Sequence, residues 1–97
     1  MSNIELIPIQ TFSVHNHIDI SFINALNSSG LIEIIRVQET EFIHEDRISD
    51  IEKFARLHYD LDINLEGVEA INYLLQRVED LQNENTRLKN KLRLHEK

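Results

Sequence analysis

The chain has 97 residues, a net charge of −7 and no cysteine. This length suits one small domain with a projecting helix, and the lack of cysteine excludes disulfides, thiolate nucleophiles and Cys-based zinc sites. No apolar run approaches the roughly 18 residues of a membrane helix, and the opening MSNIELIPIQ lacks the basic and apolar regions of a signal peptide. We therefore expect a soluble, cytoplasmic protein that does not associate with membranes.

The excess negative charge lies in the first part of the chain. Residues 1–64 hold eleven acidic and four basic side chains, whereas residues 65–97 hold six of each. Nucleic-acid affinity depends largely on Lys and Arg side chains that displace counterions, so an acidic head suits a phosphate backbone poorly. Such a head would attract a basic partner, unless its charge serves only to keep a small protein soluble.

A short strand and two short helices are predicted first. Asn3–Ile7 alternates weakly and ends at a proline, which favours a strand. Ile9–Asn16 suits a helix, and Asp19 is placed to cap a second helix over Ile20–Asn27. Two short helices with a tight connection are typical of a helix-turn-helix.

A hairpin and a third helix follow. Gly30 can adopt a positive φ where the second helix ends. Leu31–Gln38 is apolar and β-branched, and Phe42–Ile43 is apolar again after a polar stretch, which predicts a hairpin, or wing. Asp46 is placed to cap a helix over Arg47–Leu61. The expected buried face of that helix comprises Ile48, Ile51, Phe54, Ala55, His58 and Leu61.

The last part of the chain predicts one long helix, Asn64–His95. Asn64 is a suitable N-cap, and Ile63 and Val68 are spaced to form a hydrophobic staple. From Ile71 onward the apolar spacing is that of a coiled coil of about three heptads. The seam comprises Ile71, Leu74, Val78, Leu81, Asn85, Leu88 and Leu92. β-Branched residues at a positions with Leu at d favour two strands, so we expect a homodimer; packing of this stripe on the chain's own head is the alternative.

The order of these elements resembles that of MerR-type winged-helix proteins. Several short sequence segments narrow the resemblance to the chaperone-modulator family typified by CbpM. They are FSVH at Phe12–His15, GLIE at Gly30–Glu33, QET at Gln38–Thr40, RLHYDL at Arg56–Leu61, NLEGV at Asn64–Val68 and LQNEN at Leu81–Asn85. His17 stands where that family often has glycine in the turn. The resemblance covers nearly the whole chain.

The resemblance implies a mainly α fold with a small β wing. Residues 1–63 would form a MerR-like winged helix-turn-helix head, and residues 64–97 a long, dimerising coiled-coil helix. It also implies a small regulator that is not an enzyme and has no cofactor. In that family the protein binds the J-domain of a DnaJ-like co-chaperone of the CbpA type and blocks its action on the DnaK chaperone.

An acidic surface could compete for the basic helix with which J-domains dock onto DnaK. The candidate docking residues are carboxylates of the wing, the third helix and the link after it. They are Glu39, Glu41, Glu45, Asp46, Asp50, Glu52, Asp60 and Asp62. A solvated acidic face is the alternative interpretation of this cluster.

The rival hypothesis is a MerR-like transcription regulator that binds DNA as a dimer. Its second short helix would enter the major groove, where Asn24 and Asn27 could read bases. That helix contains no Lys or Arg, so phosphate anchoring around these amides would be missing. We therefore expect no strong DNA binding.

The histidines do not predict a metal or catalytic site. His15 and His17 have no third ligand nearby, and the run His44–Asp46 has no Ser, Cys or metal partner. His58 is expected to be packed or hydrogen-bonded in the core, and His44 and His95 to be exposed.

Overall fold

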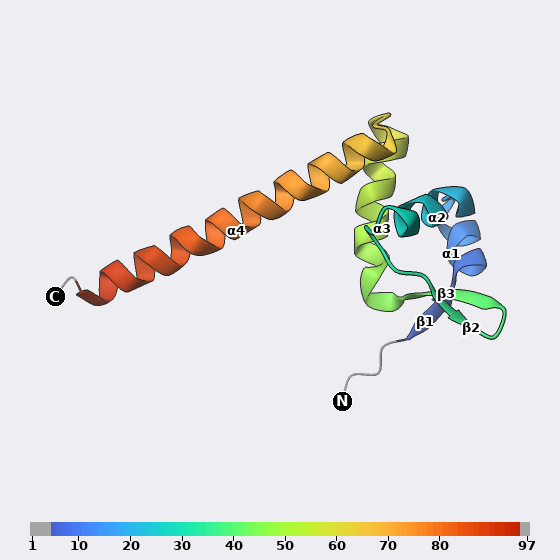
Figure 1. Cartoon of the computed structure of the whole chain (residues 1–97), viewed down its shortest axis with the longest axis horizontal. Coiled ribbons are helices and arrows are strands. Elements are labelled where there is room, and N and C mark those ends of the chain that lie inside the picture. Colours follow the sequence, from blue (N-terminus) through green and yellow to red (C-terminus); the bar gives the residue numbers. More distant parts are fainter. Residues whose placement is uncertain (1–4, 96–97) are drawn as a thin grey trace.

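The computed structural model describes residues 5–95, which form a small head and a long helix that projects from it (Figure 1). The molecule measures 61 × 38 × 21 Å. The elements are β1 (Leu6–Pro8), α1 (Ile9–Asn16), α2 (Ile20–Ser28), β2 (Ile35–Val37), β3 (Thr40–His44), the 3₁₀ turn η1 (Glu45–Arg47), α3 (Ile48–Ala55), the π-helical turn η2 (Arg56–Asp60) and α4 (Leu65–His95). The fold is therefore mainly helical with a small β wing, as predicted. The first residues of the predicted strand, Asn3 and Ile4, lie outside the described residues.

The helix-turn-helix consists of α1 and α2. α1 has the predicted bounds and ends at His17, whose φ of 55° and ψ of 42° are left-handed. The histidine thus holds a conformation that glycine adopts at lower cost. α2 follows Asp19, but the prediction that the Asp19 side chain caps it is wrong. The main-chain carbonyl of Asp19 instead accepts the N–H groups of Phe22 (3.0 Å) and Ile23 (3.2 Å), and its carboxylate makes no capping bond.

The three strands form an antiparallel sheet in the order β1-β3-β2. The β2–β3 hairpin turns at Gln38, whose φ is 51°, and Gly30 has the expected positive φ of 84°. The hairpin begins later than predicted, because the N–H groups of Leu31 and Ile32 both donate to the carbonyl of Leu26. These bonds close the end of α2 and leave only the last part of the apolar run for the sheet.

The third helix begins and ends differently from the prediction. α3 starts at Ile48, so Asp46 lies inside η1 and does not cap the helix. Beyond α3 the backbone widens into η2, which is closed by a bond from the Leu61 N–H to the Arg56 carbonyl (3.2 Å). The wider turn changes the helical phase, so Leu61 is 63% exposed and the prediction that it is buried is wrong.

The core lies between the inward faces of the three short helices, the sheet and the first turn of α4. Its buried members are Ile9, Phe12, Ile18, Phe22, Ile23, Leu26, Ile32, Ile43, Ile51, Phe54, Ala55 and Val68. The predicted N-cap of α4 is confirmed, because the side-chain oxygen of Asn64 accepts the N–H of Gly67 at 2.8 Å. Ile63 packs against the same core that buries Val68, as the predicted staple requires.

α4 leaves the head after its first two turns (Figure 1). Every described side chain from Tyr73 to Leu94 is exposed. Within residues 5–95, no helix is both long and apolar enough to cross a membrane.

Candidate functional site

Two of the eight candidate docking carboxylates are already paired within the head. Arg36 and Glu41 face each other across the β2–β3 hairpin, and a guanidinium nitrogen lies 2.7 Å from a carboxylate oxygen. Arg47 and Asp50 form a second pair, at 3.3 Å, from the end of η1 to the first turn of α3. Both pairs are partly exposed, so each stabilises the fold by well under ~1 kcal/mol. They nevertheless make these two carboxylates less available to a partner.

The other six candidates do not form one continuous face. Glu39 lines a hollow between the hairpin and the start of α1, and Asp46 lines another beside the end of β3. Glu45 and Asp62 are exposed and line neither hollow. Glu39 shares its hollow with Glu41, which is already paired with Arg36. Of the six, Glu52 and Asp60 line one hollow together.

That shared hollow, here called the turn groove, has a volume of about 440 Å³. One wall is the α1–α2 turn, residues Asn16–Ile18. The other wall is a stripe along α3 and η2. The stripe residues are Glu52, Ala55, Arg56, Tyr59 and Asp60. Sequence reasoning missed this groove, although the 3–4 spacing of the stripe residues was a visible signal for one helix face.

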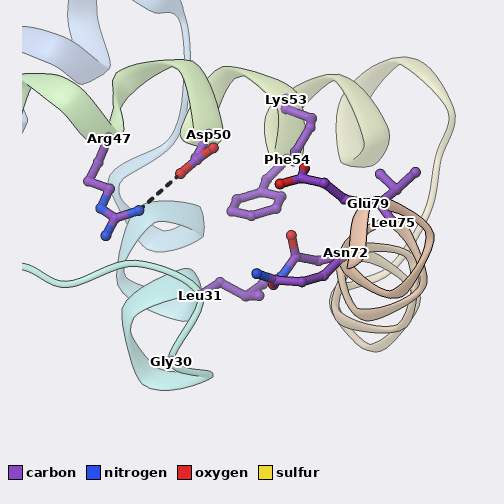
Figure 2. Close-up of a pocket in the computed structure, with 10 residues that line it drawn as sticks. Gly30, Leu31, Arg47, Asp50, Lys53, Phe54, Asn72, Leu75 and Glu79 are labelled. Atoms are coloured by element: carbon purple, nitrogen blue, oxygen red, sulfur yellow. Dashed lines mark hydrogen bonds and ion pairs between the residues drawn. The ribbon is translucent and has the colours of Figure 1, made fainter. Parts of the chain in front are cut away.

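A second groove lies between α3 and the root of α4, with a volume of about 350 Å³. Figure 2 shows Phe54 of α3 pointing into it, toward Leu31 and Asn72, with Leu75 of α4 at its edge. Leu75 lines this groove but is 47% exposed, and Tyr73 is 64% exposed, so neither side chain is buried against the head.

Charges of both signs line this second groove in equal number. The Arg47–Asp50 pair lies on one side, and Lys53 and Glu79 line it as well. The Lys53 amine sits 5.4 Å from the centre of the Phe54 ring, within the range of a cation–π contact. The groove therefore has no marked preference for a basic or an acidic partner.

The surface that would face DNA is poor in positive charge. α1, α2 and the hairpin contain a single Lys or Arg, and that residue, Arg36, is the one paired with Glu41. Asn24 is exposed on α2. The side-chain oxygen of Asn27 instead accepts the N–H of Ile34 at 3.1 Å, so it holds the chain that leads into β2. The Asn27 side chain, one of the two candidates for reading bases, is thus already engaged in a hydrogen bond within the head.

The histidines occupy three kinds of environment. His58 is part-buried and hydrogen-bonded, as predicted, while His15 and His17 are exposed. The prediction that His44 is exposed is wrong: it is half-buried, and its Nδ1 is enclosed without a hydrogen-bond partner. Among the described residues, no group of three or more His, Cys, Asp or Glu side chains is arranged to hold a metal ion. The side chain of His95 lies outside the described part.

The predicted coiled-coil seam forms a stripe along α4. Ile71 is half-buried at the root of the helix. The remaining seam residues are exposed: Leu74, Val78, Leu81, Asn85, Leu88 and Leu92. Glu84 and Arg87 form an ion pair within α4, with a guanidinium nitrogen 2.7 Å from a carboxylate oxygen. Their hydrogen bond and mutual attraction lower the pKa of the Glu84 carboxyl and raise the pKa of the Arg87 guanidinium.

A helix-turn-helix with an adjoining hairpin and a long terminal helix defines a winged-helix regulator. Residues 7–90 match the family described as MerR HTH family regulatory protein, so the chain belongs to the MerR HTH family. Such a regulatory family is typically non-enzymatic. The match confirms the MerR-type resemblance, but it does not distinguish chaperone modulators from DNA-binding regulators. Searches of curated proteins and of solved structures gave no match.

Proposed function

We propose that this protein is a chaperone modulator that binds the J-domain of a DnaJ-like, CbpA-type co-chaperone and inhibits its action on DnaK. The observation that carries the proposal is the charge of the winged-helix surface. The single Lys or Arg of α1, α2 and the β2–β3 hairpin is Arg36, and it is paired with Glu41. Phosphate contacts supply much of the affinity of DNA-binding proteins, so this surface suits a protein partner better. The short sequence segments that resemble the CbpM family support the same proposal.

The proposed unit is a homodimer formed through the seam of α4. A stripe of half-exposed Leu and Val side chains on an isolated helix is costly to leave in water, and heptad spacing fits it to a second helix. A head of this size has a small core, so association would add stability.

The direct test is the ATPase rate of DnaK stimulated by the CbpA-type co-chaperone. Adding the protein should lower the stimulated rate in proportion to the amount added, and should leave the unstimulated rate unchanged. Stimulation by a peptide substrate alone serves as the control, because it does not need a J-domain. Inhibition of both rates, or of neither, would contradict the proposal.

The rival function, a DNA-binding regulator, is favoured by the description of the matched family. It predicts tight binding of duplex DNA. On the charge argument, an anisotropy titration with random duplex and with the DNA upstream of the protein's own gene should show no binding below roughly 10 μM at low salt. Submicromolar binding would favour the rival.

A further inference from the structure

The turn groove combines an apolar floor with an acidic rim. Ile18 and Ala55 line it and are only 5% and 7% exposed, and Tyr59, 43% exposed, covers one side. Glu52 and Asp60 are two helical turns apart on the same stripe. Such a surface fits an amphipathic helix, which lays its apolar side into a groove and spreads polar side chains over the rim.

The two walls of the groove are bonded together. The hydroxyl of Tyr59 on η2 accepts the main-chain N–H of Asp19, just beyond the α1–α2 turn, at 3.2 Å. The Tyr59 ring also makes edge contacts with Phe22, at 5.5 Å between centroids, and with His58, at 4.9 Å. The turn itself is closed by a bond from the Ile18 N–H to the Ser13 carbonyl (3.1 Å). The groove is therefore formed before any partner arrives, which lowers the cost of ordering on binding.

The charges on the rim select a basic partner. Among the described residues, neither Glu52 nor Asp60 takes part in an ion pair, in contrast to Glu41 and Asp50. One cation, Arg56, lies between them along the stripe and is itself unpaired there. Lys or Arg side chains arriving from a partner could satisfy both carboxylates without breaking a contact in the head.

We propose that the turn groove receives the basic helix of the J-domain. Ile18, Ala55 and Tyr59 would contact its apolar side, and Glu52 and Asp60 would pair with its Lys or Arg side chains. This inference rests on the proposed function and adds a location to it. Of the eight candidate carboxylates, it assigns direct contact to these two.

The test compares charge reversals at two places along the same helical segment. Glu52→Lys with Asp60→Lys reverses both rim charges. Glu45→Lys with Asp46→Lys makes the same change on η1, which lies roughly 10 Å from Glu52 and roughly 20 Å from Asp60 along the helical axis. The probe is the isolated J-domain of the CbpA-type co-chaperone, titrated by calorimetry against the full chain. The groove variant should raise Kd by roughly tenfold or more, and the η1 variant by less than about twofold.

A third variant guards against loss of folding. Arg56→Glu makes the rim more acidic, so it should lower Kd about threefold, a gain that misfolding cannot produce. If the wild type does not bind the J-domain, both the proposed function and the assignment of the turn groove as the binding site are wrong. If the wild type binds but the two double variants weaken it equally, or only the η1 variant does, the groove is the wrong location and the proposed function stands. An unchanged or raised Kd for Arg56→Glu also overturns the groove.

Discussion

The imidazole of His58 on η2 stacks on the Phe22 ring of α2, with ring centroids 4.7 Å apart and planes inclined by 12°. Its Nδ1 also lies 2.8 Å from the main-chain oxygen of Ile63. A carbonyl can only accept, so Nδ1 carries the proton in this contact. One side chain thus joins the helix-turn-helix, the π-helical turn and the link into α4, and we infer that it helps to set the direction in which α4 leaves the head.

We predict that His58→Ala lowers the free energy of unfolding by about 2 kcal/mol, from a lost hydrogen bond and lost aromatic packing. The measurement is urea unfolding followed by circular dichroism, at one protein concentration so that any dimerisation is held constant. His15→Ala is the matched control, because His15 is exposed on α1, and it should change stability by less than about 0.5 kcal/mol. Equal losses for both variants would show that His58 has no special packing role.

Gly67, in the first turn of α4, yields a second prediction. Gly→Ala inside a helix usually adds up to about 1 kcal/mol of stability. Here a Cβ at position 67 would lie 2.5 Å from Cγ2 of Ile63 and 3.1 Å from the capping oxygen of Asn64. Ile63 is β-branched and packs against the core, so it moves aside only at a cost. We therefore expect Gly67→Ala to destabilise the protein by about 1 kcal/mol.

A double variant checks the cause. In an Ile63→Ala background the clashing methyl group is gone, so adding Gly67→Ala should become neutral or stabilising. The measurement is the free energy of unfolding of the four proteins in this double-mutant cycle: wild type, the two single variants and the double variant. If Gly67→Ala has the same effect in both backgrounds, the strain lies elsewhere.

These elements show what the sequence could predict and where it could not. Apolar periodicity placed α1, α2 and α4 well, because burial of one face decides where a helix forms. Caps were less certain: Asn64 caps α4, but the Asp19 and Asp46 side chains do not cap their helices. A capping residue works only when the chain before it turns the side chain back toward a free N–H, and composition alone does not show that turn. The π-helical turn was also hidden, so Leu61 was misplaced.

The sequence could predict that the candidate site is rich in carboxylates, but it could not predict how these carboxylates are arranged in space. An excess of carboxylates in the head is plain from composition. Which of them are paired depends on hairpin register, since Arg36 meets Glu41 only when the strands align. The turn groove joins residues of the α1–α2 turn to residues of α3 and η2, far apart in the chain. No local spacing reveals such a meeting, which needs the packed fold.

The seam of α4 yields a prediction on assembly. Leu81→Lys would place a charge in the middle of the coiled coil, so it should convert a dimer to monomer or unfold it. Asn85→Leu should instead stabilise the coil and broaden its oligomeric state, because a single polar a residue specifies pairing. Sedimentation velocity over tens of micromolar measures both. A monomeric wild type across that range would mean that the seam does not mediate self-association.

The last prediction concerns the salt dependence of J-domain binding. If unpaired carboxylates of the head attract a basic helix, they act over long range before contact and so raise the association rate. The Debye length falls from ~10 Å at 0.1 M salt to ~3 Å at 1 M. Association should therefore slow by at least roughly tenfold across that range, while dissociation changes much less. Stopped-flow fluorescence with a labelled J-domain separates the two rates.

A charge reversal on α4 is the control for this experiment. Glu79→Lys with Asp80→Lys alters net charge as much as Glu52→Lys with Asp60→Lys, but on the projecting helix. The α4 variant should keep most of the wild-type salt dependence, and the groove variant should lose most of it, because attraction between opposite charges weakens steeply with separation. If both lose it equally, bulk charge and not the groove guides association. If the wild-type association rate is independent of salt, the protein still binds the J-domain, but long-range electrostatic attraction does not speed association.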